Sequence, residues 1–331
     1  MDLLDKSILI TGGTGSFGKK FTEIVLKRFN PRKLIIFSRD EYKQHEMAKV
    51  FSEEKYPNIR FFLGDVRDRN RLVRAFEDVD YIIHTAALKQ VPALEYNPME
   101  AVKTNIFGAD NVIHAAIDTG VKKVIALSTD KAANPANLYG ATKLVAEKIF
   151  VSANAYTGNK VKFSVVRYGN VVGSRGSVVP LFLNLKKKGT KEYPITDVNM
   201  TRFWITLEQG VEFVLRALEE SEGGEIFVPK IPSMRIIDLA KALESDFKIK
   251  LIGIRPGEKI NEVMISEEEA RNTKLYNGIY VILPQFFVRE GLLEKYKNYP
   301  SVPDGFLYRS DKNDMWLTIN ELKNIVKNIE E

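Results

Sequence analysis

Tyr139 and Lys143 are the pair of side chains with the most direct catalytic chemistry in the sequence. They stand four residues apart at the beginning of a helix predicted over residues 138–156. Side chains at this spacing lie on one face of a helix, so both can act on one site. The ammonium of Lys143 would lower the pKa of the phenol. The pattern therefore predicts that Tyr139 accepts a proton from a hydroxyl group near neutral pH.

Asp130 and Lys131 form a second pair of ionisable groups, nine residues before Tyr139. They follow a predicted strand, at the carboxyl end where ligands bind in open parallel sheets. The pair is therefore a candidate for a catalytic role. The alternative is an ion pair in a loop that ends the strand. The position beside Tyr139 favours the catalytic interpretation.

A glycine motif directly follows the first predicted strand. Gly12 permits a tight turn, Gly15 lets the backbone approach a pyrophosphate, and Gly18 lets the next helix pack on the strand. The first turn of that helix offers free N–H groups to the phosphates. The motif predicts a dinucleotide site, which also includes Thr14, Ser16 and Phe17.

The end of the second predicted strand indicates which dinucleotide binds. An NAD site usually has an acidic residue there for the ribose 2′-OH. Ser38 removes that carboxylate, and Arg39 can hold a 2′-phosphate, helped by Lys43 one helical turn later. Asp40 could instead accept from a 2′-OH, which leaves NAD open. The residues favour NADP.

Residues at the next two strand ends extend the expected cofactor site. Asp65 and Val66 follow the third strand, where a carboxylate can bind the adenine amino group. The small residue Ala86 follows the fourth strand and lets the backbone run beneath the cofactor ribose. Lys89 comes next, and Lys143 is expected to hold the nicotinamide ribose.

Strand and helix signals alternate through the first half of the chain. Several apolar runs are continuous, as in strands covered on both faces, and alternation implies a parallel sheet with right-handed crossovers. We predict an α/β fold with a Rossmann-like doubly wound parallel sheet. The expected strands are 7–11, 33–38, 59–64, 80–85, 123–128 and 162–168. The expected helices are 17–29, 41–52, 69–76, 105–119 and 138–156.

Glycine and proline become more frequent after about residue 168. We predict a dinucleotide-binding domain over residues 1–170 and a smaller substrate-binding region over residues 171–331. A helix near 207–220, a strand near 225–228 and a helix near 236–243 are expected. Elements near 203–228 are expected to return to the first sheet.

The composition excludes several classes of function. The 331 residues include 49 Lys and Arg, 43 Asp and Glu, and no cysteine, which excludes disulfides and cysteine nucleophiles. The three histidines, His45, His84 and His114, are dispersed, so no metal site is expected. The sequence has no apolar run long enough to span a membrane, no signal peptide and no basic stripe for nucleic acid. We expect a soluble cytoplasmic protein that binds neither membrane nor nucleic acid.

The glycine motif and the Tyr-x-x-x-Lys pattern together resemble the extended short-chain dehydrogenase/reductases. Further stretches resemble the inverting UDP-N-acetylglucosamine 4,6-dehydratases (5-epimerising) of pseudaminic acid biosynthesis. The resemblance runs from about residue 6 to 262 and more loosely to 316, although His would be expected in place of Gln90. The matching stretches are 128–135, 137–143, 167–177, 200–204 and 255–259.

The resemblance implies a reaction cycle with no net redox change. Tyr139 takes the O4 proton while a hydride moves from C4 to tightly bound NADP+. The ketone formed at C4 makes the neighbouring C5 proton acidic. Lys131 is the base at C5, and Asp130 is the acid that protonates the departing O6. The hydride returns to C6, and reprotonation inverts C5. We expect Lys143 and the oxidised nicotinamide to lower the pKa of Lys131, with Asp130 opposing this change, and burial to keep Asp130 protonated.

The resemblance also implies contacts to a UDP-sugar. Asn170 would donate to a phosphate or a sugar hydroxyl, Arg202 and Arg255 would clamp the diphosphate, and Glu258 would accept from the uridine ribose. Arg255 and Glu258 could instead form an exposed ion pair, and Arg175 is either a phosphate contact or a packing residue. The expected substrate contacts are Lys89, Asn170, Arg175, Arg202, Arg255 and Glu258, and Val171 joins the cofactor site.

Two other functions remain open. An NADP-dependent UDP-sugar 4-epimerase would share Tyr139 and Lys143 but would need no acid–base pair at positions 130 and 131. A non-catalytic nucleotide-binding protein would need none of these residues. The resemblance further implies a homo-oligomer, a hexamer, and a place in flagellin glycosylation.

Overall fold

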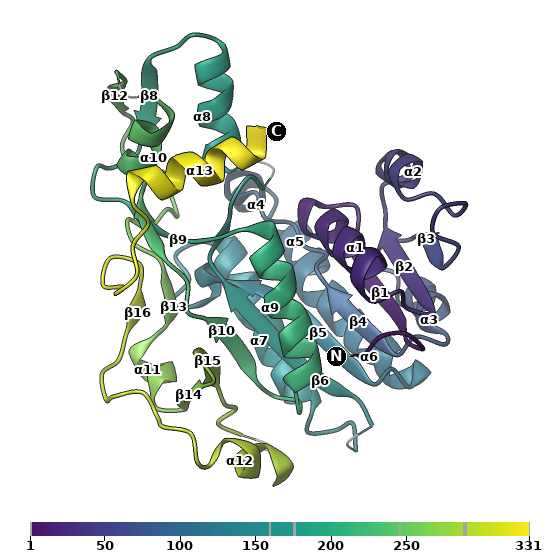
Figure 1. The fold of residues 1–331 in the computed structure, drawn as a ribbon. Helices are drawn as coiled ribbons and strands as arrows, with labels where there is room; N and C mark the ends of the chain where they lie inside the picture. The colour runs from purple at the N-terminus through teal and green to yellow at the C-terminus, as the bar shows by residue number, and fades with distance from the viewer. Residues whose placement is uncertain (1, 159, 175–176, 245, 287–289, 331) are drawn as a thin grey trace.

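A nine-stranded sheet forms the centre of the molecule (Figure 1). A computed structural model describes residues 2–158, 160–174, 177–244, 246–286 and 290–330. The strands of the sheet are β1 (Ser7–Thr11), β2 (Lys33–Ser38), β3 (Ile59–Leu63), β4 (Tyr81–His84), β5 (Lys123–Thr129), β6 (Lys162–Tyr168), β10 (Ile226–Pro229), β14 (Thr273–Tyr276) and β15 (Ile279–Ile282). Their order is β14-β15-β10-β6-β5-β4-β1-β2-β3. Strands β10 to β3 run parallel, whereas β15 and β14 are antiparallel to their neighbours.

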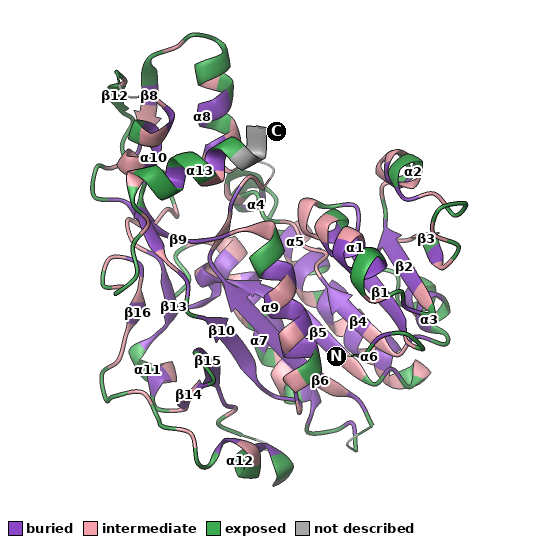
Figure 2. Ribbon diagram, in the orientation of Figure 1, coloured by how far each residue is buried: buried purple, intermediate pink, exposed green. Residues whose placement is uncertain are grey.

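Helices cover both faces of this sheet. The helices α1 (Ser16–Arg28) and α9 (Leu207–Glu220) pack together on one face, while α3 (Arg69–Phe76), α6 (Gly108–Thr119) and α7 (Leu138–Ala153) lie on the other. Every residue of β1 is buried, as a strand covered on both sides requires (Figure 2). The predicted α/β fold with a doubly wound parallel sheet is confirmed. Among the described residues, no helix is long and apolar enough to cross a bilayer.

Asn137 determines where α7 begins. Its side-chain oxygen accepts a hydrogen bond from the Gly140 N–H at 2.8 Å, and its amide donates to the Gly257 carbonyl at 2.7 Å. A Cβ atom at Gly140 would lie 2.2 Å from the carbonyl oxygen of Lys131, so only glycine permits this approach. The start of α7, which carries Tyr139, is therefore held against Lys131.

A second, smaller core lies beside the sheet. It contains apolar side chains such as Phe182, Tyr193, Leu239 and Leu322. The elements around it are α8 (Val178–Lys187), β8 (Glu192–Ile195), α10 (Ile236–Leu243), β12 (Lys248–Leu251) and α13 (Ile319–Glu330). The remaining short strands of the second half are β7 (Asn170–Val171), β9 (Thr201–Ile205), β11 (Ser233–Arg235), β13 (Val263–Ile265) and β16 (Tyr308–Arg309), and its short helices are α11 (Glu267–Ala270) and α12 (Glu290–Tyr296).

More of the second half returns to the first core than the sequence predicted. Beyond the expected α9 and β10, the strands β14 and β15 extend the sheet, and side chains between Met264 and Tyr308 pack in the first core. The strand β9 lies between the two cores. Its Phe203 and Ile205 enter the first and its Trp204 enters the second, because successive side chains of a strand point in opposite directions.

The segment before α6 differs from the predicted helix over 105–119. The chain forms the short helices α4 (Val91–Tyr96) and α5 (Pro98–Ala101), then a π-helical turn, η1 (Val102–Phe107), before α6 begins at Gly108. Asn105, in this turn, donates to the Leu88 carbonyl and accepts from the Leu88 N–H. Single π-helical turns occur frequently at functional sites. Here it anchors the loop that carries Lys89.

Candidate active site

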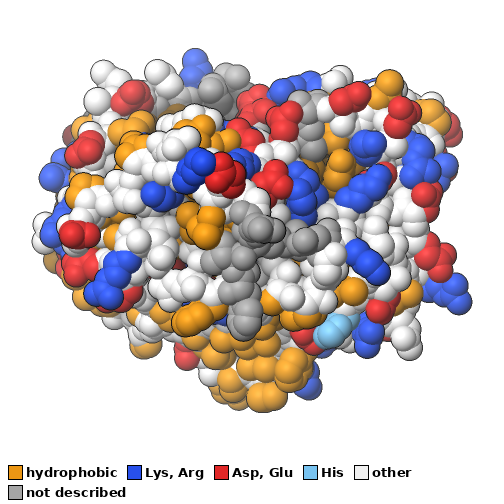
Figure 3. Space-filling model, turned by 90° about the horizontal axis from the view of Figure 1, so that it is seen from below, with side chains coloured by type: hydrophobic (Ala, Val, Ile, Leu, Met, Phe, Trp, Pro, Cys, Tyr) orange, Lys and Arg blue, Asp and Glu red, His pale blue; other side chains and the backbone are white. Residues whose placement is uncertain are grey.

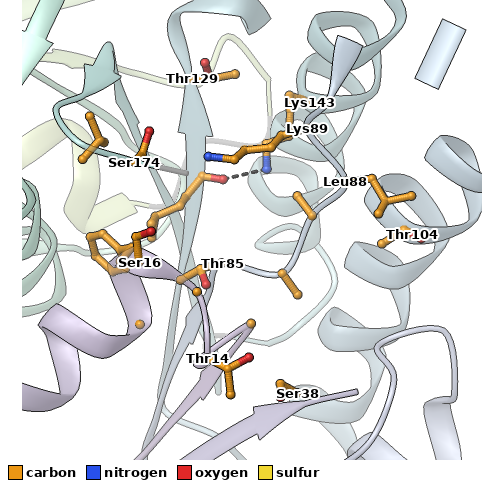
Figure 4. Close-up of a pocket in the computed structure, with 18 of the residues that line it drawn as sticks. Thr14, Ser16, Ser38, Thr85, Leu88, Lys89, Thr104, Thr129, Lys143 and Ser174 are labelled. Carbon is orange, nitrogen blue, oxygen red and sulfur yellow. Dashed lines mark hydrogen bonds between the residues drawn. The ribbon is translucent and has the colours of Figure 1, made fainter. Parts of the chain in front are cut away.

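A cavity of about 810 Å³ opens at the carboxyl ends of β1, β2, β4, β5 and β6. In Figure 4, Thr14 and Ser38 lie at one end of the view, and Thr129, Lys89 and Lys143 lie toward the other. The catalytic residues expected from the sequence, Asp130, Lys131 and Tyr139, line this cavity. All expected cofactor residues line it as well, namely Gly12, Thr14, Gly15, Ser16, Phe17, Gly18, Ser38, Arg39, Asp40, Lys43, Asp65, Val66, Ala86, Lys89, Lys143 and Val171.

The glycine turn at one end of the cavity is packed so closely against its neighbours that two of its residues must lack a Cβ atom. Gly12 has a φ of +67°, and a Cβ atom there would lie 2.9 Å from the backbone nitrogen of Ala86. At Gly18 a Cβ atom would lie 2.2 Å from the carbonyl oxygen of Gly13, so α1 can pack this closely only through glycine. The first residues of α1, Ser16, Phe17 and Gly18, line the cavity, and a helix N-terminus in that position suits a pyrophosphate.

The charged residues beyond Ser38 form their own ion pairs. Asp40 caps α2 (Glu41–Val50) by accepting from the Lys43 N–H, and its carboxylate also pairs with the Lys43 ammonium. Arg39 is 53% exposed in its side chain, and its guanidinium lies 3.8 Å from Asp65. Asp65 pairs more closely with Arg67, at 2.7 Å. The carboxylate of Asp40 is thus directed to its own helix, while Arg39 remains accessible at the cavity.

Tyr139 and Lys143 line the same cavity, but their predicted electrostatic relation is wrong. The Nζ atom of Lys143 donates to the Leu127 carbonyl at 2.6 Å (Figure 4). Burial lowers the pKa of Lys143 to about 8, with Glu147 opposing the change. Desolvation raises the pKa of Tyr139 to about 12, and the cation that opposes this rise is Lys131. The ammonium of Lys131 therefore takes the electrostatic part that the sequence assigned to Lys143.

The predicted lowering of the pKa of Lys131 is also wrong. Its Nζ atom lies 3.1 Å from Asp130 Oδ1 and 3.1 Å from Oε1 of Glu262. Burial by itself would lower the pKa of Lys131, but these two carboxylates outweigh it and hold the pKa above its ordinary value. Burial raises the pKa of Asp130, as the sequence predicted. The acid of the pair is arranged as expected, whereas the base is a protonated ammonium.

The expected substrate residues divide into two groups. Lys89 and Asn170 line the cavity, and the buried Oδ1 atom of Asn170 has no hydrogen-bond partner among the described residues. Arg202 is turned away from the cavity, because its guanidinium donates to the carbonyls of Thr201, Lys259 and Ile260.

Arg255 and Glu258 do not line the cavity either. They form the ion pair that the sequence left as the alternative, at 3.2 Å, with Arg255 largely exposed. Arg175 lies outside the described residues. Of the five expected substrate contacts among the described residues, the structure brings Lys89 and Asn170 to the cavity.

Comparison with known proteins identifies the family. Residues 8–284 match the family described as "Polysaccharide biosynthesis protein". A curated relative from Campylobacter jejuni subsp. jejuni serotype O:2, "UDP-N-acetylglucosamine 4,6-dehydratase (inverting)", is 56% identical over 98% of each chain. The chain belongs to this polysaccharide biosynthesis family. The resemblance predicted from the sequence motifs is confirmed.

Other relatives of the polysaccharide biosynthesis family carry different names. A curated protein of Rickettsia bellii, "UDP-glucose 4-epimerase", is 47% identical over 84% of this chain and 83% of its own. The solved structure of Pen from Bacillus thuringiensis is 39% identical and has a TM-score of 0.89, covering 100% of this chain and 99% of that one.

In this member of the polysaccharide biosynthesis family, the sequence did not reveal two sets of buried charges. One is Glu262 beside Lys131. The other is Arg167 of β6, which is fully buried and donates to both Glu147 of α7 and Glu269 of α11. The only sequence signal for Arg167 was a cation inside an apolar strand. This triad ties the helix of Tyr139 and Lys143 to the sheet and to the second half of the chain.

Proposed function

We propose that the protein converts UDP-N-acetylglucosamine to a UDP-4-keto-6-deoxy sugar with inversion at C5. The observation that carries the proposal is that Tyr139, Asp130 and Lys131 line the same cavity as the glycine turn that would bind a dinucleotide. A 4-epimerase would need Tyr139 but not an acid–base pair beside it. The curated relative from Campylobacter jejuni supports the same reaction.

We propose NADP as the resident cofactor. The glycine cradle fits a pyrophosphate, and accessible Arg39 with Ser38 fits a 2′-phosphate. The carboxylate of Asp40, which an NAD site would use, is paired with Lys43. Bound NADP+ would supply the hydride acceptor at C4 and later the donor at C6. The ribose next to the nicotinamide would be held by Lys143.

The protein's own groups would then move the protons. Tyr139 would take the O4 proton, and Asp130 would protonate the departing O6. Lys131 is proposed as the base at C5, which requires its ammonium to give up a proton first. The two carboxylates beside it oppose that loss. Tyr139 must be a phenolate before it can take the O4 proton, and the Lys131 ammonium favours that form by opposing the rise in the pKa of Tyr139.

We further propose that the protein forms a homo-oligomer, for which the resemblance implies a hexamer. Exposed apolar side chains lie on helices that contact one another, including Tyr96 of α4, Phe107 of η1 and Val145 of α7. Figure 3 shows hydrophobic side chains gathered along one edge of the face it draws. The proposed pathway is pseudaminic acid biosynthesis for flagellin glycosylation.

Mass spectrometry of the sugar product tests the proposed reaction. Incubation with UDP-N-acetylglucosamine and no added reductant is expected to yield a product lighter by one water. Substrate deuterated at C4 is expected to give product deuterated at C6, because the label stays within one active site. Retention of the water with exchange of the C4 configuration would indicate the 4-epimerase, and an unchanged sugar would indicate a non-catalytic protein.

A further inference from the structure

Glu262 is a buried carboxylate at the edge of the proposed active site. It directly precedes β13, its side chain is 2% exposed, and it does not line the cavity. Its Oε1 atom lies 3.1 Å from the Nζ atom of Lys131. Lys131 therefore contacts two carboxylates, of which only Asp130 faces the cavity.

The surroundings of Glu262 favour its ionised form. Arg202 Nε and Lys259 Nζ each lie 3.9 Å from its oxygens, in addition to Lys131. Arg202 is fixed there by backbone carbonyls, and Lys259 by the Ala133 carbonyl at 2.9 Å. Burial alone would raise the pKa of Glu262, but the three cations outweigh it and lower the pKa below its ordinary value.

The surroundings of Asp130 favour its protonated form. Asp130 is fully buried, and the cation within ion-pair distance is Lys131, which it shares with Glu262. Its Oδ1 atom accepts from the Thr129 hydroxyl at 2.8 Å, and its Oδ2 atom, like Oε2 of Glu262, has no hydrogen-bond partner among the described residues. The two carboxylates therefore differ in the cations around them and not in this respect. Tyr139 and Lys259 are the other titratable groups near it. Two buried carboxylates beside one ammonium cannot both ionise without a large penalty.

We propose that Glu262 is a positioning residue that serves as the permanent counter-ion of Lys131 and thereby leaves the proton on Asp130. The inference rests on the proposed function, because it explains how Asp130 is an acid at neutral pH while touching an ammonium. Glu262, which does not line the cavity, balances the positive charge of Lys131. The Oδ2 atom of Asp130 can then carry a proton toward the cavity, where the departing O6 would take it.

Infrared difference spectroscopy tests this assignment without turnover. The spectrum of the NADP+-loaded wild type minus that of Asp130→Asn is expected to contain the carbonyl band of a protonated carboxyl group at neutral pH. In the Glu262→Gln background the same difference is expected to lose that band, because Asp130 becomes the main counter-ion of Lys131 and ionises. Glu267→Gln removes an exposed carboxylate five residues later and is expected to keep the band.

Kinetics give a second readout. Glu262→Gln is expected to retain reduction of the bound cofactor by the sugar, to lose about 10²-fold in release of water, and to lose activity with rising pH earlier than the wild type. A protonated-carboxyl band that survives in Glu262→Gln, or a wild-type rate of water release in that variant, overturns the proposal.

The test also holds if Glu262→Gln does not fold. Absence of the band from the wild-type minus Asp130→Asn spectrum would then overturn the proposal on its own. If the protein fails to dehydrate UDP-N-acetylglucosamine, the proposed function falls, while the infrared result still decides where the proton lies.

Discussion

The Nζ atom of Lys143 lies 2.6 Å from the carbonyl oxygen of Leu127, inside the protein and one helical turn after Tyr139. A neutral amine or an ammonium can make this hydrogen bond, so the contact does not require charge. Burial lowers the pKa of Lys143 to about 8, which places its titration close to physiological pH. Burying the charged form of Lys143 therefore destabilises the folded protein. Hydrogen bonds from its ammonium to a bound cofactor ribose would offset that loss of stability.

Lys143→Met is expected to stabilise the free protein while weakening cofactor binding. The pKa of Lys143 falls from 10.5 to about 8 on folding, so the folded state resists the charge. The cost of about 3 kcal/mol is fully present below pH 8 and disappears as the pH rises toward 10.5. After loss of the bond to Leu127, a net gain of roughly 2 kcal/mol remains below pH 8. Urea unfolding of both proteins across this range measures the difference, and a difference independent of pH contradicts the assignment.

Arg167→Met is expected to destabilise the protein by about 3–5 kcal/mol, because it leaves Glu147 and Glu269 buried without their cation. The matched control is Arg74→Met, which breaks the largely exposed pair of Arg74 with Glu77 and is expected to cost less than about 1 kcal/mol. Chemical denaturation measures both variants. Equal effects would mean that the buried triad contributes no more than a surface ion pair.

Arg39→Ala is expected to weaken binding of NADP+ by roughly 10–100-fold and to change binding of NAD+ little. The reason is that the accessible guanidinium of Arg39 would make charge-assisted hydrogen bonds only with a 2′-phosphate. Isothermal titration of both cofactors with both proteins measures the effect. The same loss for NAD+ would show that Arg39 supports the site through Asp65 rather than through the phosphate.

Lys131→Ala and Tyr139→Phe are expected to stop the reaction at different steps. Without Lys131, oxidation at C4 slows, because the cation that lowers the pKa of Tyr139 is lost. The absorbance of reduced cofactor still builds up, because dehydration falls by about 10²–10⁴-fold for lack of a base. Without the phenol, no such absorbance develops, because the O4 proton is not removed. Stopped-flow absorbance combined with product analysis separates the two variants. Dehydration by Lys131→Ala at near the wild-type rate would place the base elsewhere, with Tyr139 the next candidate.

Local patterns in the sequence were sufficient to predict the parallel strands of the first sheet and the glycine turn that lines the cavity. The strands β1, β2 and β6 and the helices α3, α9 and α10 begin and end where the sequence predicted. Helix α9 illustrates the reason, because Thr206 and Gln209 form a capping box that can be recognised from adjacent residues. The glycine turn connects two consecutive elements, β1 and α1, so it can be predicted without knowledge of contacts between distant residues.

The sequence by itself selected the groups to consider as reactive, and the tertiary structure decided what surrounds them. Tyr139 was selected by its spacing from Lys143, whereas Asp130 and Lys131 took their expected roles from the resemblance. Their proton affinities depend on Glu262 and Arg202, which packing brings in from the second half of the chain. Electrostatic interaction depends on distance in space and on burial, and neither can be obtained from separation along the chain. For the same reason Arg202, predicted to clamp a phosphate, is instead held by backbone carbonyls behind Lys131.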